Sequence, residues 1–324
     1  MRARRASVGC VVFVLAVAVG GCSDAASDAY QPAALPEGST WVPDGDDIVV
    51  FSADPEDVVG LDLAADPCGE SEVSQVFVRN MATGEVECVS ISTTGEPGRD
   101  YSGNPVATPD GRFVAFVTTS SNLVPGDTNR GASSSRPGFD VFVRDRATEE
   151  TRRVSLPPEW EEFHGMVGNP SISDNGRYVA FSAAEEDGYG FDAAYYPQVY
   201  RFDQATAESL PVALTRAGSW PDGWVESPVM SSDAQRIAFV SYATNLGWGG
   251  DGSQPHILVW DEDSGVFTDL GVPGNLSPES LAISADGRFV AFGVARPTDA
   301  QIPGCPKPGI CLVGVDSGSG EWIG

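Results

Sequence analysis

Positively charged side chains are scarce in this 324-residue chain. Lys307 is the only lysine, His164 and His256 are the only histidines, and 19 Lys+Arg residues stand against 46 Asp+Glu residues. The formal net charge is −27, and a field of this sign repels nucleic-acid phosphates and attracts cations or basic partners. The composition therefore argues against nucleic acid as a partner. Most of the carboxylates are expected to lie on a solvated surface.

Signatures of hydrolytic enzymes and zinc sites are also missing from the sequence. It contains no Gly-x-Ser-x-Gly elbow, no alternation of helices with strands, and no CxxC spacing. The many carboxylates prevent any one pair from pointing to glycoside chemistry. His164, among carboxylates in Glu-Glu-Phe-His-Gly, is either a general base or a plain polar loop residue, whereas His256 opens an expected strand. We therefore predict no catalytic residue.

One long apolar run is present, and it lies at the N-terminus. Arg2, Arg4 and Arg5 precede it, and it stops at Gly20-Gly21. The run is too short for a comfortable transmembrane helix, and a basic start followed by an apolar segment is typical of an export signal. We therefore assign residues 1–21 as a signal peptide.

At the end of this run, small residues directly precede a cysteine. The segment Val19-Gly20-Gly21-Cys22 resembles the lipobox of bacterial lipoproteins, which implies that Cys22 becomes the lipidated first residue. Residues 22–39 are rich in small residues and contain proline, as expected of a flexible tether. The resemblance implies an exported protein anchored by lipid to the outer side of a bacterial cell membrane. An ordinary signal peptide with an incidental cysteine is the alternative.

Four further cysteines lie in the mature chain: Cys68, Cys88, Cys305 and Cys311. An even number of cysteines in an exported domain predicts disulfides, and four cysteines allow three pairings. We favour the local pairing, which joins Cys68 to Cys88 and Cys305 to Cys311.

A short pattern occurs five times along the chain. The copies are ATPDGRFVAF, ISDNGRYVAF, MSSDAQRIAF, ISADGRFVAF and the looser VPDGDDIVVF. Each copy ends in an apolar, β-rich run, and a tight turn precedes it, in which glycine tolerates positive φ. A second recurrent strand follows each copy and stops before a small-residue turn, at Asn80, Asp145, Asp203, Asp261 and Asp316. Each repeat therefore predicts four antiparallel strands.

A four-stranded unit cannot cover its own faces, so such units must stack around an axis, as in a β-propeller. The pattern Pro/Ser-Asp-Gly-Arg-x-Val-Ala-Phe, followed by x-Val-Phe-Val-x-Asp-x-x-Thr-Gly, resembles the WD-repeat-like motif of TolB-type propellers over about residues 40–324. The fourth copy departs from it with Asp233-Ala234, the first has an extra residue near Asp46, and TolB's separate N-terminal domain has no counterpart. We predict an all-β fold with five four-stranded blades over 40–324. Six blades are the alternative, because the resemblance often implies six.

The connections between strands fall on two faces of such a propeller. The Asp-Gly and Thr-Gly turns share one face, and their aspartates are expected to cap turns. The longer loops share the other face, where binding is expected. Aromatic rings stack on sugars or grip peptide side chains, although rings in loops also pack the loops onto the blades. The candidate ligand-binding residues are Trp160, Phe163, His164, Tyr195, Tyr196, Trp220, Trp224 and Trp248, and Tyr101 is expected on the same face.

Calcium is the one metal that the loops suggest. Asp127, Asn129 and Asp140 place oxygen ligands along one loop, and Asn245 and Asp251 form an echo of it in the fourth repeat. The loop lacks the full twelve-residue EF-hand pattern, and Asp/Asn/Gly/Ser loops are also common as turns. We predict no cofactor and keep calcium as the alternative.

These observations predict an extracytoplasmic, lipid-anchored propeller. We expect it to act as a binding or scaffold module for a cell-envelope partner, which is a protein, a peptide or a glycan. A propeller-type hydrolase or lyase acting on envelope glycan or peptide is the alternative, because a fold alone does not decide function.

Overall fold

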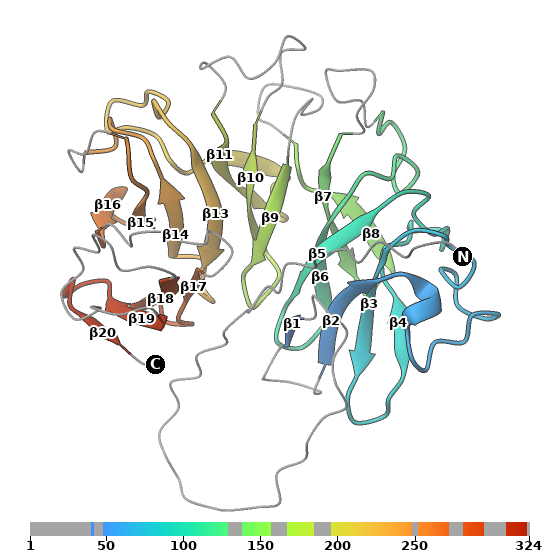
Figure 1. The fold of residues 1–324 in the computed structure, drawn as a ribbon. Helices are drawn as coiled ribbons and strands as arrows, with labels where there is room; N and C mark the ends of the chain where they lie inside the picture. Colours follow the sequence, from blue (N-terminus) through green and yellow to red (C-terminus); the bar gives the residue numbers. More distant parts are fainter. Residues whose placement is uncertain are drawn as a thin grey trace, which may run out of the picture.

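Five four-stranded antiparallel sheets make up the protein. The computed structural model describes residues 40–41, 48–128, 138–156, 167–184, 196–247, 252–271, 281–294 and 309–322. Each sheet consists of four strands that are consecutive in the sequence, and the sheets follow one another around a common centre from the blue end of the chain to the red end (Figure 1). The prediction of an all-β propeller with five blades is confirmed.

The blades are numbered in chain order. Blade 1 contains β1 (Thr40–Trp41), β2 (Ile48–Ala53), β3 (Gln75–Asn80) and β4 (Val86–Cys88). Blade 2 contains β5 (Ser102–Ala107), β6 (Phe113–Thr118), β7 (Asp140–Asp145) and β8 (Glu150–Arg153). Blade 3 contains β9 (Val167–Ile172), β10 (Tyr178–Ala183), β11 (Gln198–Asp203) and β12 (Glu208–Pro211). Blade 4 contains β13 (Val225–Met230), β14 (Arg236–Ser241), β15 (His256–Asp261) and β16 (Val266–Asp269). Blade 5 contains β17 (Ala282–Ile283), β18 (Phe289–Val294), β19 (Gly309–Gly314) and β20 (Gly320–Trp322).

Helical structure is limited, within the described ranges, to the short 3-10 turn η1 (Pro55–Asp57). No helix in those ranges is long and apolar enough to cross a membrane.

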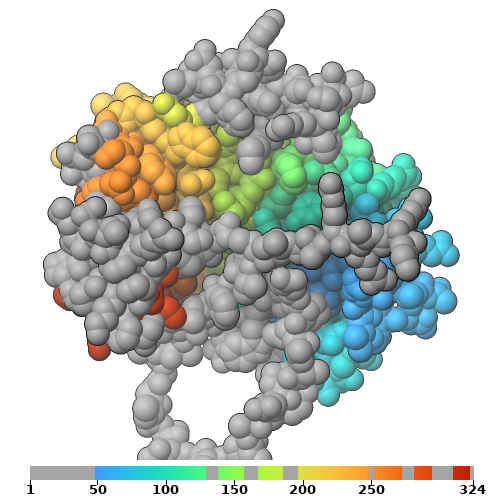
Figure 2. Space-filling view, viewed as in Figure 1, coloured from blue at the N-terminus to red at the C-terminus, as the bar shows by residue number. Residues whose placement is uncertain are grey.

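The core lies between successive blades. Both faces of the second and third strands of a blade are buried, which explains why these strands read as continuous apolar runs instead of alternating ones. Four clusters each combine residues of two neighbouring blades, and in the space-filling view the surfaces of blades 1 to 4 adjoin one another in order (Figure 2). The repeated phenylalanines at the end of the pattern are fully buried, namely Phe51, Phe116, Phe181, Phe239 and Phe292.

Blade 1 covers one of its faces by itself. Phe116 packs against blade 1, but its repeat equivalent Phe51 packs against Phe77 and the disulfide between Cys68 and Cys88, within a cluster made only of blade 1 residues. The insertion between β2 and β3 therefore takes the position that a preceding blade has elsewhere. Among the described strands, none is shared between the first and last blades.

The structure describes only one cysteine of the second predicted disulfide, which joins Cys305 to Cys311. Cys311 is buried in β19 and is disulfide-bonded. Cys305 lies outside the described residues.

The repeated turns are held by side-chain hydrogen bonds. Thr108 Oγ1 donates to Asp110 Oδ1 at 2.6 Å, and Asp110 Oδ1 also accepts from the backbone N–H of Arg112 at 3.0 Å. The same two bonds recur at Ser173 with Asn175, at Ser231 with Asp233 and at Ser284 with Asp286. The expectation that aspartates cap these turns is confirmed for Asp110, Asp233 and Asp286, and Asn175 takes the same role in blade 3.

Candidate functional site

A pocket of about 460 Å³ lies near the common centre of blades 2, 3 and 4. The first strands of these blades, β5, β9 and β13, contact one another in succession and therefore lie nearest the axis. Residues from their starts and from the loops before them line the pocket, which places it on the face of the long loops. We call it the axial pocket, and its lining is Tyr101, Asn104, Val117, Phe139, Val167, Gly168, Asn169, Ser182, Ala184, Pro197, Trp224 and Glu226.

A bulge distorts each of these three inner strands. Asn104, Asn169 and Ser227 have φ of 49°, 52° and 55°, and a proline follows each of them. The register of pairing to the next strand shifts at each of these places. A β-bulge bends a strand and redirects the neighbouring side chains, and Asn104, Asn169 and Glu226, which lie at these bulges, all line the axial pocket.

Glu226 is the only acidic residue of the described lining. Its equivalents before the bulges of blades 2 and 3 are Gly103 and Gly168, so a carboxylate stands in blade 4 where two other blades carry no side chain. Burial raises the pKa of Glu226. Its charge also adds to the effect of burial in raising the pKa of the Tyr242 phenol. No described residue forms a hydrogen bond or ion pair with its carboxylate.

Three aromatic residues, Tyr101, Phe139 and Trp224, line the same pocket as Glu226. The Tyr101 and Phe139 rings meet edge to face at 6.5 Å between their centroids. Tyr101 also lies over Gly103, because a Cβ atom there would collide with the tyrosine Oη. Tyr101 and Trp224 are 41% and 43% exposed, which is far more than a ring that only packs a core. The pocket thus combines accessible aromatic surface with one poorly solvated negative charge.

Three of the eight predicted face residues fall in the described ranges. Trp224 lines the axial pocket. Trp220 is 53% exposed and its ring lies 6.3 Å from that of Tyr200, outside the pocket lining. Tyr196 is half-buried, and its carbonyl accepts a hydrogen bond from Gln198 Nε2 at 2.9 Å. The other five, Trp160, Phe163, His164, Tyr195 and Trp248, lie outside the described residues.

Phe139 and Glu226 were missed by the sequence reasoning. A signal for Glu226 exists in the repeat alignment, where it stands against two glycines before the Asn-Pro or Ser-Pro dipeptide. Phe139 directly precedes β7, and no pattern in the sequence separates it from a core residue.

The loop that carries Trp220 is clamped to the neighbouring loop. Asn245 Nδ2 donates to the Trp220 carbonyl at 2.9 Å, and Asp222 accepts hydrogen bonds from the backbone N–H groups of Thr244 and Asn245. Burial alone would raise the pKa of Asp222, but hydrogen bonds from the Thr244 hydroxyl and from these two backbone N–H groups outweigh burial and lower the pKa. Asn245, which echoes the calcium pattern in the sequence, therefore serves to position a loop.

Asp127 and Asp140 come together in the structure, but an arginine lies with them. Both side chains are buried, and Arg153 Nη1 lies 3.4 Å from Asp127 Oδ1 and 3.9 Å from Asp140 Oδ2. Ser155 Oγ donates to Asp140 Oδ1 at 2.5 Å. The guanidinium supplies the positive charge that calcium would bring, so a bound ion would have to displace Arg153. Asn129 lies outside the described residues, and calcium binding remains a prediction.

His256 opens β15, as expected. Its Nδ1 lies 3.0 Å from Asp269 Oδ1 of the neighbouring strand β16, and Asp269 Oδ1 accepts from the backbone N–H of Gly271 at 2.8 Å. The imidazole thus joins two adjacent strands and a turn, which is a structural role.

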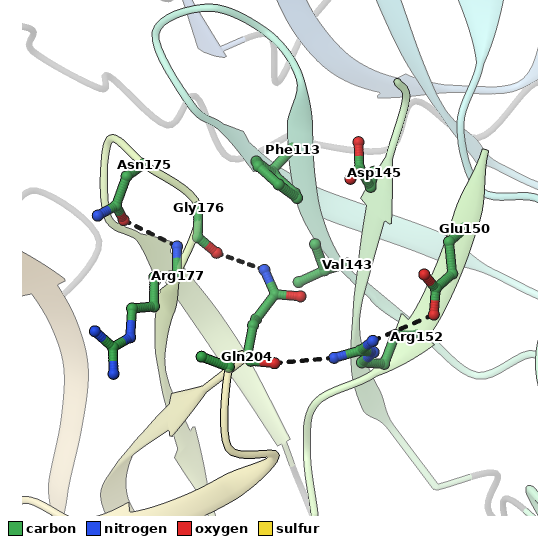
Figure 3. A pocket seen from close by; sticks show the side chains of 10 residues that line it. Phe113, Val143, Asp145, Glu150, Arg152, Asn175, Gly176, Arg177 and Gln204 are labelled. Carbon is green, nitrogen blue, oxygen red and sulfur yellow. Dashed lines mark hydrogen bonds and ion pairs between the residues drawn. The ribbon is translucent and has the colours of Figure 1, made fainter. Parts of the chain in front are cut away.

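A second cavity, of about 300 Å³, lies on the opposite face between blades 2 and 3 (Figure 3). Phe113 and Val143 line it together with polar groups that are bonded to one another. Gln204 Nε2 donates to the Gly176 carbonyl, Arg152 donates to the Gln204 carbonyl at 3.1 Å, and Arg152 also pairs with Glu150. A smaller cleft occupies the corresponding place between blades 4 and 5. These clefts are a product of blade packing, and we place the candidate site in the axial pocket.

Comparison with known proteins identifies the fold. No family model matches the sequence, and no curated protein sequence matches it. The structure of TolB from Acinetobacter baumannii is 16% identical, with a TM-score of 0.50, and the match covers 87% of this chain and 54% of that one. A structure from a study of two prolyl endopeptidases is 10% identical, with a TM-score of 0.51, and the match covers 88% of this chain and 36% of that one.

Both known structures are much longer than the part that matches. This chain spans about half of the TolB structure and about a third of the endopeptidase structure, and identities this low show the fold alone. The chain has a TolB-like β-propeller fold.

Proposed function

We propose that the protein is an exported binding or scaffold module that holds a cell-envelope partner, a protein, peptide or glycan, in the axial pocket. The observation that carries the proposal is the pocket itself, where exposed Tyr101 and Trp224 share the lining with Glu226, whose carboxylate has no partner among the described residues. Concave sites with accessible aromatic rings and a few polar groups are the usual form of ligand pockets. On the opposite face of the propeller, by contrast, the polar groups are hydrogen-bonded to one another, as Arg112 is to Asp145 and Arg177 is to Asp203.

The geometry favours binding over catalysis. Glycoside hydrolysis ordinarily uses a pair of carboxylates. Glu226 has no second carboxylate or histidine beside it in the described lining of the pocket. A function as a hydrolase or lyase therefore remains the alternative, and no feature of the described pocket supports it.

Export and anchoring belong to the same proposal. The Cys68–Cys88 disulfide is typical of an oxidising compartment outside the cytoplasm. Residues 1–21 act as the signal peptide and Cys22 carries the lipid, so Cys22→Ala should release the protein from the membrane fraction. A Cys22→Ala variant that stays in that fraction with unchanged mobility would contradict the anchor.

Binding is tested with glycan and peptide arrays, using the chain with Cys22→Ala. We expect at least one class of ligand to bind, and Trp224→Ala should weaken that binding by about 1 to 3 kcal/mol without lowering the melting temperature. Trp220→Ala is the control, because Trp220 is also exposed, at 53%, but lies outside the described lining of the pocket. Ligands that bind Trp224→Ala and the parent chain equally well would place the site elsewhere.

A further inference from the structure

We infer that the axial pocket accepts the positively charged side chain of an arginine or lysine in a bound peptide, with Glu226 as its counter-ion. The rings of Tyr101, Phe139 and Trp224 would form the walls around the cation. This inference rests on the proposed function and narrows its ligand to a basic peptide segment.

Space is available beside the carboxylate. Gly168 lines the same pocket as Glu226, and a Cβ atom added to Gly168 would meet no atom within 4 Å. The inner strands β9 and β13, which carry these two residues, contact one another. A ligand group can therefore enter next to Glu226 without displacing a side chain at this point of blade 3.

The described lining leaves the charge of Glu226 uncompensated. It contains no arginine, lysine or histidine, and most of its members are apolar or aromatic. Removing a carboxylate from water without a partner is costly. A cation in the pocket would form an ion pair at low solvation and would also face aromatic rings, which attract it through their π electrons. A neutral ligand would supply neither effect.

The protein builds the same arrangement around one of its own arginines. Arg201 is buried between blades 3 and 4, with its guanidinium carbon 4.7 Å from the Tyr178 ring centre and 5.2 Å from the Trp260 ring centre. Its Nη1 lies 2.5 Å from Glu262 Oε2. Two rings and one carboxylate thus enclose a guanidinium there. The axial pocket presents the rings and the carboxylate, and the cation comes from the ligand.

The charge of the whole protein acts in the same direction. A net charge of −27 raises the local concentration of basic segments and repels acidic ones. This long-range attraction is common to the whole surface, so the selection of one side chain depends on Glu226 and its surrounding rings.

The test compares two peptides that differ in one charge. Gly-Gly-Arg-Gly-Gly amide and the same peptide with neutral citrulline are titrated to millimolar concentration into the full chain with Cys22→Ala, and binding is followed by NMR. We expect the arginine peptide to bind about tenfold more tightly than the citrulline peptide. Glu226→Gln should remove that preference without lowering the melting temperature. Glu208→Gln, an exposed glutamate on β12, should leave the preference unchanged.

Several outcomes would overturn the inference. These are equal binding of the two peptides, no binding of either, or an arginine preference that survives Glu226→Gln. Glucosamine serves as a second organic cation. If glucosamine binds in a way that depends on Glu226 and the arginine peptide does not bind, the assignment of the ligand as a peptide is overturned. Array ligands that depend on Trp224 but not on Glu226 would refute this inference alone, whereas the absence of any Trp224-dependent ligand would refute the proposed function.

Discussion

The repeated turns on one face and the axial pocket on the other hold their carboxylates in opposite ways. On the face of the repeated turns, Arg112 binds Asp145 through two hydrogen bonds of 2.9 and 2.7 Å, which lower the pKa of Asp145. In the axial pocket, no described residue pairs with Glu226, and burial raises its pKa. Groups on the first face stabilise the fold, whereas Glu226 costs stability. Residues of the second kind are common at binding sites.

The largest expected effect separates core rings from pocket rings. Phe116 is fully buried between blades 1 and 2, so Phe116→Ala should lower the free energy of unfolding by about 3 to 5 kcal/mol. Trp224→Ala removes a ring that is 43% exposed and should leave stability nearly unchanged. Thermal melting of the two variants checks this, and early melting of Trp224→Ala would make Trp224 part of the loop core.

The covered face of blade 1 provides the next test. Replacing both Cys68 and Cys88 by Ala opens a loop whose ends are 20 residues apart and should cost about 3 kcal/mol. The loss should appear first as faster hydrogen exchange in β2 and β3, since the disulfide packs on Phe51 and Phe77. If hydrogen exchange rises equally in all five blades, the insertion between β2 and β3 does not stabilise blade 1 more than the other blades.

A smaller effect is expected at the repeated turn. Gly176 has φ of 72°, and a Cβ atom there would collide with the Phe113 ring of the preceding blade. Gly176→Ala should therefore destabilise the protein by on the order of 2 kcal/mol or more. Gly218→Ala is the control, because Gly218 has φ of 78° but no neighbour within 4 Å. Equal losses at the two positions, measured by urea unfolding, would exclude a role for contact between blades.

Acid should weaken the face of the repeated turns. Hydrogen bonds from Ser284 and Arg288 lower the pKa of Asp286 to about 2. A lowered pKa contributes stability above the ordinary value of 3.8, and that stability is lost as the pH falls toward 2. Asp286→Asn should flatten this part of the curve of melting temperature against pH. An unchanged slope would mean that Asp286 is bonded no better in the fold than in the unfolded chain.

Glu226 should show the opposite and smallest effect. Its raised pKa favours the fold below the ordinary value of 4.5, and this advantage is lost as the pH rises through the higher pKa of the folded state. Glu226→Gln should therefore raise the melting temperature slightly at neutral pH, and the gain should vanish in acid. A loss of stability at neutral pH would show that the carboxylate has a structural partner.

Much of the fold was predictable because the repeat is local. The turn residues and apolar runs of ATPDGRFVAF specify a hairpin within a few residues, and five copies specify five units. The candidate site was predictable only in outline. Trp224 was expected on the loop face, but Glu226 was hidden among 46 acidic residues. Only the inner-strand bulges and the neighbouring blades place it in an aromatic pocket.

Tertiary structure alone decided which charges have partners. The loop sequence around Asp127 and Asp140 is compatible with calcium, and Arg153 of β8 lies beside both carboxylates. Likewise, the sequence allows a disulfide between Cys68 and Cys88. Only the tertiary structure shows that this disulfide packs on Phe51 and buries the face of blade 1 that has no preceding blade. The sequence by itself determined the hairpins, the number of blades and the buried phenylalanines, because these depend on local turn chemistry and periodicity. Burial, pairing and solvation depend on residues far apart in the chain, so they followed only from the arrangement of the blades.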